Sequence, residues 1–358
     1  MKHTKKMSII IFLLLTVISI STIVLSQPCF GRNPRGSRLE RVKKSPFYKN
    51  GEFQNEESTV LMTGKHSYLT SLRDMLTGRK RSKRLIPKEG EVPVMKSDLK
   101  HLPEDKDLYV WFGHSSFLLR LSGKTILVDP VFIAFSPVSS IMGKVFPGTD
   151  IYKPEDMPDT IDYLIVSHDH YDHLDHKTVV ALKDRVGKVI CPLGVGENFE
   201  HWGYAKEQII ELDCNENYAD DFIFHCLPTR HFSGRTLKRN KTQRASWLIE
   251  TPIRKVFYSG DGGYGVRFKR FGQQFPDIDL AIMENGQYDE NWCNIHTMPE
   301  ELGKEVSELQ PNRFITVHHS KVALANHAWD EPRENERKAA EDSGIPLITC
   351  CIGEIVTL

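Results

Sequence analysis

The sequence predicts an α/β protein whose strands carry polar side chains at one end. From Asp107 onward, short apolar runs typical of buried strands alternate with stretches that have helical spacing. Five of these apolar runs lead into residues that can bind a metal or carry a proton. These residues are His168 with its neighbours, His231, Asp261, Glu284 and His318. We expect side chains at neighbouring strand ends to share one rim of the sheet structure and to form one site.

The predicted domain begins with three strands separated by tight turns, at 108–112, 117–121 and 125–128. This pattern predicts an antiparallel meander. Further strands are expected at 161–166, 188–192, 208–212, 222–227, 245–250, 255–259, 279–283, 314–317, 345–352 and 354–358. Helices are expected at 177–186, 194–204 and 299–309.

The densest group of candidate ligands directly follows the predicted strand 161–166. Residues 167–176 read SHDHYDHLDH and contain four histidines and three aspartates. Imidazole and carboxylate groups are the ligands of zinc and similar divalent metals. Residues two apart point the same way on an extended chain, so His168 and His170 can bind one metal. Asp172 and His173 lie where the chain turns and can reach a second metal beside the first.

Two polar residues upstream are candidates for orienting these ligands. Asp129 ends the strand 125–128, where its carboxylate could hold a ligand histidine in place. His114 could do the same, or it could be a simple turn residue.

The first 28 residues form a segment of their own. Three lysines precede the uncharged apolar run Met7–Leu25, and Cys29 follows Pro28. This arrangement predicts a signal peptide or, because the run is nearly long enough to cross a bilayer, an uncleaved membrane anchor. A lipidated Cys29 is disfavoured, since Pro28 replaces the small residue such sites carry. We therefore expect a protein of the cell envelope, periplasmic or in the outer membrane.

Residues 29–106 are expected to form an N-terminal arm and extension ahead of a domain at 107–358. Residues 30–60 combine prolines, glycines and charges with few apolar side chains, which is typical of an extended arm or a linker. A short helix is predicted at 67–76. The basic cluster at 79–84 is either a solvated loop or a segment attracted to anionic phospholipid headgroups.

Charge and cysteine content exclude some classes of protein. The 358 residues include 47 Lys+Arg and 47 Asp+Glu, whereas a general nucleic-acid binder is usually basic, so no nucleic-acid partner is expected. The seven cysteines are scattered and include no C-x-x-C pair. This spacing predicts mostly buried free thiols and no disulfide framework.

The order of the candidate ligands resembles that of the metallo-β-lactamase superfamily, over about 107–358. The match consists of His-x-His-x-Asp-His at 168–173, a later histidine, Gly-Asp-Gly at 260–262 and a final histidine. The resemblance implies a four-layer αβ/βα sandwich, the metallo-β-lactamase fold. It also implies that His168, His170 and His231 bind one metal, that Asp172, His173 and His318 bind the other, and that Asp261 bridges both.

The choice of His318 over His319 follows from position, because His318 directly ends the predicted strand 314–317. The flanking segments resemble the N-acylphosphatidylethanolamine-hydrolysing phospholipase D branch, which includes RomA-like outer-membrane proteins. These segments are 113–116, 129–130, 228–231, 246–247, 260–265, 296–301 and 323–326. The sequence departs from that phospholipase at Arg230, in place of a glutamine, and at His319-Ser320, in place of a tryptophan and a glycine. Both departures are expected to line the pocket and so bear on the choice of lipid.

The resemblance implies a hydrolase with two divalent metal ions, for which zinc is the expected species. Such a pair lowers the pKa of a bridging water, so that hydroxide forms near pH 7 and attacks the substrate. Asp172 is expected to accept a proton as well as to bind metal. His296 is the candidate for contacting the phosphate or leaving group, with an ordinary place before a helix as the alternative.

The expected reaction is phosphodiester hydrolysis of phospholipase D type, on lipids like N-acylphosphatidylethanolamine and in association with a membrane. Two other functions compete with it. One is a lactonase or amidase that uses the same metals, because the ligands do not fix the bond that is cleaved. The other is a non-catalytic exported protein that binds metal or lipid.

Overall fold

Two β-sheets form the centre of the molecule in the computed structural model, which describes residues 2–64, 84–137, 143–236 and 238–358. The first sheet contains β3 (Leu108–Trp111), β4 (Phe117–Leu121), β5 (Lys124–Val128), β6 (Ile161–Ile165), β7 (Val186–Pro192), β8 (Ile209–Leu212) and β15 (Ile355–Thr357). The second contains β9 (Asn217–Ala219), β10 (Ile223–Pro228), β11 (Ala245–Glu250), β12 (Lys255–Tyr258), β13 (Leu280–Glu284) and β14 (Phe314–Val317). The predicted helix 67–76 and residues 79–83 of the basic cluster lie outside the described residues.

The strand order in both sheets brings the ends of several strands to one rim. The first sheet runs β15-β3-β4-β5-β6-β7-β8, and the second runs β14-β13-β12-β11-β10-β9. The strands β3, β4 and β5 form the predicted antiparallel meander, and β5 to β8 are parallel. In the second sheet β10, β11 and β12 alternate in direction, whereas β12, β13 and β14 are parallel.

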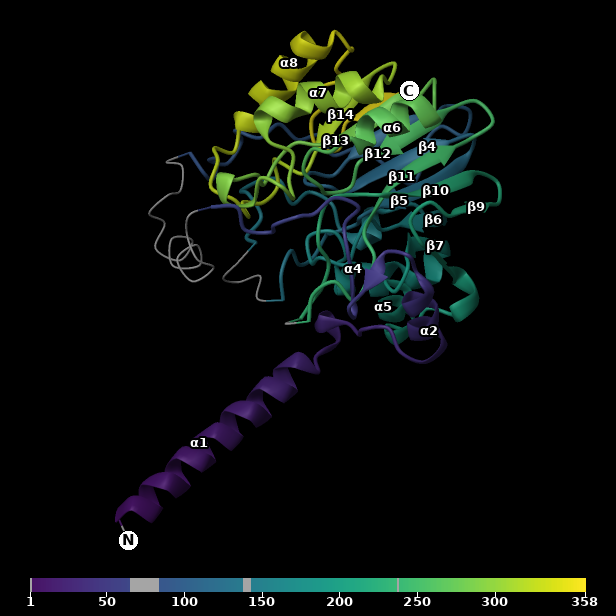
Figure 1. Cartoon of the computed structure of the whole chain (residues 1–358). Coiled ribbons are helices and arrows are strands. Elements are labelled where there is room, and N and C mark those ends of the chain that lie inside the picture. The colour runs from purple at the N-terminus through teal and green to yellow at the C-terminus, as the bar shows by residue number, and fades with distance from the viewer. Residues whose placement is uncertain (1, 65–83, 138–142, 237) are drawn as a thin grey trace.

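Helices cover the outer face of each sheet, so the molecule has four layers (Figure 1). The helices α4 (His176–Leu182) and α5 (Gly196–His201) pack on the first sheet, through residues such as Val179 and Phe199. The helices α6 (Arg267–Gln274), α7 (Pro299–Leu309) and α8 (Glu331–Ser343) pack on the second. This arrangement confirms the predicted four-layer αβ/βα class.

The layer between the sheets is the main hydrophobic core. Its largest fully buried side chains include Trp111, Phe117, Phe224 and Trp247. The indole Nε1 of Trp247 donates a hydrogen bond to Val166 O at 3.0 Å, just before the histidine-rich segment. The core therefore fixes the strand end from which that segment starts.

The N-terminal region consists of α1 (Lys2–Leu25), η1 (Pro28–Phe30), α2 (Gly36–Lys44) and a hairpin of β1 (Tyr48–Lys49) with β2 (Glu52–Phe53). In Figure 1, α1 projects away from the rest of the molecule. Within the described part of the chain, no helix combines the length and the apolar character needed to cross a membrane.

The prediction of an extended arm over 30–60 is wrong at α2. Sequence reasoning missed this helix because long-range ion pairs hold it in place and its own apolar residues are few. Arg38 Nη1 lies 2.8 Å from Glu197 Oε2, and its Nε lies 2.6 Å from Glu211 Oε2. Val42 on the same helix is fully buried against Leu193.

The predicted strand at 345–352 is also wrong. In this stretch only Leu347 and Ile352 form isolated bridges, with Phe314 and Val94 respectively. The segment carries the chain from the edge of the second sheet to β15 in the first, so its apolar residues belong to a connection. Short 3₁₀ turns complete the chain: η2 (Pro154–Asp156), η3 (Lys183–Arg185), η4 (Lys206–Gln208) and η5 (Glu290–Trp292).

Candidate metal centre

The polar residues predicted at strand ends meet at one rim of the two sheets. His168 follows β6, His231 follows β10 and Asp261 follows β12, while His318 follows β14. These four side chains are all buried, with at most 2% of each exposed. The sheet topology therefore assembles donors from both sheets into one place, as the sequence predicts.

The first cluster consists of His168, His170 and His231. Nε2 of His168 lies 2.8 Å from Nδ1 of His170, and Nε2 of His231 lies 3.2 Å from the same Nδ1. All three donor atoms lie within 4.8 Å of one another, close enough to hold one cation.

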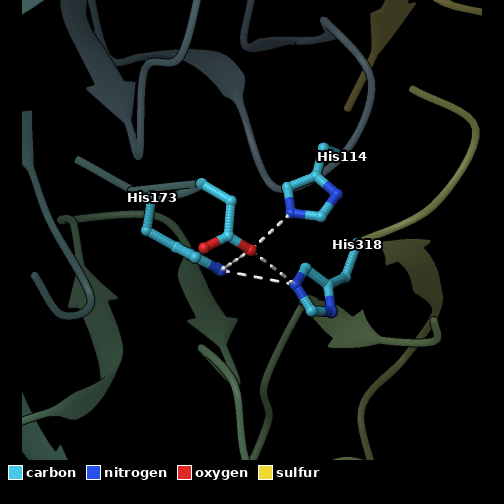
Figure 2. Close-up of side chains that lie close together, drawn as sticks. His114, His173 and His318 are labelled. Carbon is cyan, nitrogen blue, oxygen red and sulfur yellow. Dashed lines mark hydrogen bonds and ion pairs between the residues drawn. The ribbon is translucent and has the colours of Figure 1, made fainter. Parts of the chain in front are cut away.

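The second cluster is centred on the carboxylate of Asp172. Its Oδ2 lies 2.9 Å from His114 Nε2, 3.5 Å from His318 Nε2 and 3.6 Å from His173 Nε2. Figure 2 shows His114, His173 and His318 arranged around one carboxylate, which these distances identify as that of Asp172. The structure thus brings together the three ligands predicted for the second metal and adds His114 beside them.

Asp261 lies between the two clusters. Its Oδ2 is 3.1 Å from His173 Nε2 and 3.3 Å from His318 Nε2, and it is 3.9 Å from His231 Nε2 and 4.0 Å from His168 Nε2. Its Oδ1 is buried without a hydrogen-bond partner among the described residues. A buried carboxylate oxygen with no donor nearby fits a site that holds cations.

The hydrogen bonds behind the histidines also fit a metal site. His173 Nδ1 lies 2.8 Å from Asp129 Oδ2, and His231 Nδ1 lies 2.8 Å from Ile295 O. Both oxygens are acceptors, so each Nδ1 carries the proton and each Nε2 presents a lone pair to the centre. Asp129 therefore occupies the orienting position that the sequence suggested.

Burial and charge make the centre favourable for cations. Burial lowers the pKa of His168 and His231 well below the ordinary value and lowers that of His170 to about 3. Burial is the largest single effect on His173 and His318 as well and acts to lower their pKa, but the neighbouring carboxylates, Asp261 foremost, together outweigh it and raise the pKa of both. The second cluster thus attracts positive charge, which divalent ions would supply in place of protons.

Three residues of the centre have backbone conformations that are uncommon outside glycine. His114, Asp129 and His318 have φ of 51°, 41° and 73°. Such strained residues persist where the surroundings fix them, and they gather at functional sites. Gly260 has φ of 58°, and a Cβ there would meet Ala245 O at 2.6 Å, so the turn that presents Asp261 requires glycine.

His296, the predicted contact for phosphate or leaving group, lies beside the metal centre. Its ring is 5.0 Å from that of His231 and stacks on that of His318 at 5.5 Å. Its Nδ1 contacts Glu284 Oε1, and the same oxygen lies 3.2 Å from His318 Nδ1. Glu284, a polar strand end without an assigned role in the sequence, thus lies against both rings.

Two of the residues at which the sequence departs from the phospholipase pattern, Arg230 and His319, make side-chain contacts outside the two clusters. Arg230 donates from Nε to Thr59 Oγ1 and from Nη1 to Tyr264 O, so its guanidinium supports the N-terminal region. His319 packs on Trp111 with ring centroids 4.8 Å apart and contacts Thr316 Oγ1 through Nε2. These contacts agree with the preference for His318 as the ligand.

Comparison with known families now identifies this arrangement. A family model described as "Beta-lactamase superfamily domain" matches residues 124–319, which is more than half of the chain. The chain belongs to this superfamily. The match includes every predicted metal ligand, and it confirms the resemblance drawn from the sequence.

Relatives within the superfamily are similar over different lengths. An uncharacterised protein of Mycobacterium tuberculosis is 32% identical over 319 residues, covering 88% of this chain and 85% of the relative. The N-acyl-phosphatidylethanolamine-hydrolyzing phospholipase D 1 of Caenorhabditis elegans is 28% identical, covering 68% and 74%. The outer membrane protein RomA of Klebsiella pneumoniae is 48% identical over 110 residues, covering 31% and 83%.

Among solved structures, the fold is similar to that of CmlA, a diiron β-hydroxylase from Streptomyces venezuelae. The TM-score is 0.55 at 19% identity, covering 72% of this chain and 55% of CmlA. Together with the two clusters, the comparisons describe a metal-binding hydrolase of the superfamily, with candidate ligands for divalent cations.

Proposed function

We propose that the protein is a dinuclear metal hydrolase that cleaves a phosphodiester bond in lipids like N-acylphosphatidylethanolamine. The observation that carries this proposal is the place of Asp261 Oδ2, 3.1–4.0 Å from Nε2 atoms of four histidines. A carboxylate shared by two clusters is what a pair of cations requires.

The residues of the centre have different proposed roles. The first cluster and the second cluster would each hold one divalent ion, with Asp261 shared, and such ions lower the pKa of bound water and neutralise charge on a phosphodiester. Neighbouring imidazoles, His173 foremost, overcome the effect of burial and hold the pKa of Asp172 well below its ordinary value. Its Oδ2 lies 2.9–3.6 Å from Nε2 of three histidines, which supports a ligand role for Asp172, and its role as proton acceptor stays a prediction.

His296 is the residue proposed to contact the substrate, and its ring lies beside His231 of the first cluster and His318 of the second. Its Nδ1 is engaged by Glu284, so Nε2 is the ring atom left to interact with a phosphate oxygen or a leaving oxygen. Glu284 Oε2 also accepts a hydrogen bond from Gly262 N at 2.8 Å, next to Asp261. The same buried side chain therefore contacts His296 and the backbone next to Asp261.

The relatives support the lipid substrate and the location. Two relatives are N-acyl-phosphatidylethanolamine-hydrolyzing phospholipases D, from Caenorhabditis elegans and Saccharomyces cerevisiae. RomA is an outer membrane protein, and the apolar N-terminal run agrees with a protein of the cell envelope that works at a membrane surface. Imidazole and carboxylate donors suit zinc, and zinc is the proposed metal, although the same donors also bind iron.

The reaction is tested with purified full-length protein loaded with zinc and given vesicles that contain N-acylphosphatidylethanolamine. We expect release of phosphatidic acid and an N-acylethanolamine, together with slower hydrolysis of bis(p-nitrophenyl) phosphate. Lactone and amide substrates are run in parallel. Turnover of lactones or amides without turnover of either phosphodiester would contradict the proposed bond specificity, while leaving the metal centre intact.

A further inference from the structure

Arg235, four residues after His231, is a buried arginine whose hydrogen bonds run to backbone carbonyls. Only 6% of the residue is exposed. Its Nη1 donates to Asp169 O at 3.0 Å and to Leu174 O at 2.6 Å. Its Nε and Nη2 both donate to Cys29 O, at 3.1 and 2.6 Å. Burying a charged group is unfavourable unless it is well hydrogen-bonded, and these four hydrogen bonds satisfy the guanidinium.

The two carbonyls on Nη1 bracket the metal-binding loop. Between Asp169 and Leu174 lie three of the predicted ligands, namely His170, Asp172 and His173. His231 belongs to the same segment as Arg235. A single guanidinium therefore joins the two ligand-bearing segments on which the first cluster depends.

The loop also binds back to the segment that carries Arg235. The ring of Tyr171 lies 4.2 Å from the guanidinium carbon, and its hydroxyl donates to Arg235 O. Gly234 N donates to Asp169 Oδ1 at 2.7 Å, and Thr242 Oγ1 donates to Asp169 Oδ2 at 2.8 Å. The contact is thus reciprocal, with bonds in both directions between the same two segments.

The third carbonyl, that of Cys29, brings the N-terminal region into this support. Cys29 is the middle residue of η1, and the preceding Pro28 O accepts a hydrogen bond from Trp202 Nε1 at 2.9 Å. Phe30 packs edge-on against Tyr171, with ring centroids 6.3 Å apart. Residues 28–30 therefore lie directly against the metal-binding loop.

We propose that Arg235 is a positioning residue for the metal centre, which fixes the loop 169–174 in register with His231 and against residues 28–30. This inference rests on the metal centre proposed above, and it does not depend on the identity of the substrate. A planar guanidinium can reach all three carbonyls at once, whereas a lysine ammonium of the same charge lacks the fork needed to span them.

The test replaces Arg235 by lysine in the full-length protein and titrates the metal-free protein with Co²⁺. Groups that orient metal ligands typically contribute about 10- to 100-fold in metal affinity, so Arg235→Lys should weaken Co²⁺ binding by that factor. We also expect a changed visible spectrum of bound Co²⁺ and faster amide hydrogen exchange over 169–174.

The matched control is Arg185→Lys. Arg185 makes the same kind of contact far from the centre, since Nη1 donates to Met157 O at 3.1 Å and Nη2 to Pro154 O at 2.6 Å. This variant should keep the Co²⁺ affinity and the spectrum of the unchanged protein.

Wild-type affinity and spectrum in a folded Arg235→Lys variant would overturn the inference. If that variant does not fold, Tyr171→Phe decides, because it removes only the reciprocal hydroxyl. A weaker Co²⁺ affinity in Tyr171→Phe would support the inference, and an unchanged affinity would overturn it. If the wild-type protein binds no Co²⁺, the metal centre itself is refuted. The failure of this inference and the failure of the proposed metal centre are therefore distinguishable.

Discussion

Asp261→Asn should bind less metal and should hydrolyse phosphodiesters at the background rate. The amide keeps the shape of the side chain but removes the negative charge that lies between the two histidine clusters. Removing one oriented catalytic group commonly costs about 10²–10³ in rate, and loss of the shared ligand should cost at least as much. The variant should remain folded by circular dichroism, because the core between the sheets is apolar and separate from the rim.

The control for this variant is Asp279→Asn. Asp279 is a half-buried aspartate of the same sheet, and its Oδ2 accepts a hydrogen bond from Lys255 N at 2.8 Å, at the opposite end of β12. It should keep both metal and activity. Full metal content and full activity in Asp261→Asn would mean that the shared ligand has been assigned to the wrong residue.

Asp129→Asn should lower metal affinity and stability together. The carboxylate accepts from Ser167 N at 2.7 Å and Ser167 Oγ at 2.6 Å, and Oδ2 also meets His173 Nδ1 at 2.8 Å and Tyr258 OH at 2.7 Å. An amide replaces one acceptor oxygen by a donor, so buried donors lose their partner at about 1–3 kcal/mol each. Metal affinity should fall by about 10- to 100-fold, since His173 loses the group that orients it.

Thermal unfolding and metal titration of this variant are compared with those of Asp162→Asn. Asp162 lies at the other end of β6, is half-buried, and accepts from Thr125 N at 2.9 Å. We expect the control to bind metal as the unchanged protein does. Equal metal affinity in the two variants would show that Asp129 does not orient His173.

The sequence predicts those parts of the fold in which local pattern and final contacts agree. α7 begins at Pro299 with two glutamates in its first turn and buries Leu302, Val306 and Leu309 at helical spacing, so its bounds are predicted to the residue. α8 is missed because its sequence EPRENERKAAEDS has no apolar face, and its place depends on packing against α7.

At the metal centre too, the sequence predicts the residues that follow from a local pattern and misses those that depend on long-range contacts. The donors between His168 and His173 are close together in sequence, and the others follow strands, so they are visible without coordinates. Arg235 is not, because its partner Cys29 is 206 residues away and an isolated arginine in a polar stretch gives no signal. Glu284 is visible as a strand end, but its contact with two imidazoles depends on how β13, β14 and the segment before α7 come together.

The central claim, that Asp261 is shared by two metal-binding clusters, is tested most directly by elemental analysis of the purified full-length protein. Protein saturated with Zn²⁺ and freed of excess metal should contain about two equivalents per chain, as two clusters that share one carboxylate require. One equivalent that added metal does not increase would contradict the dinuclear centre and, with it, the role proposed for Asp261.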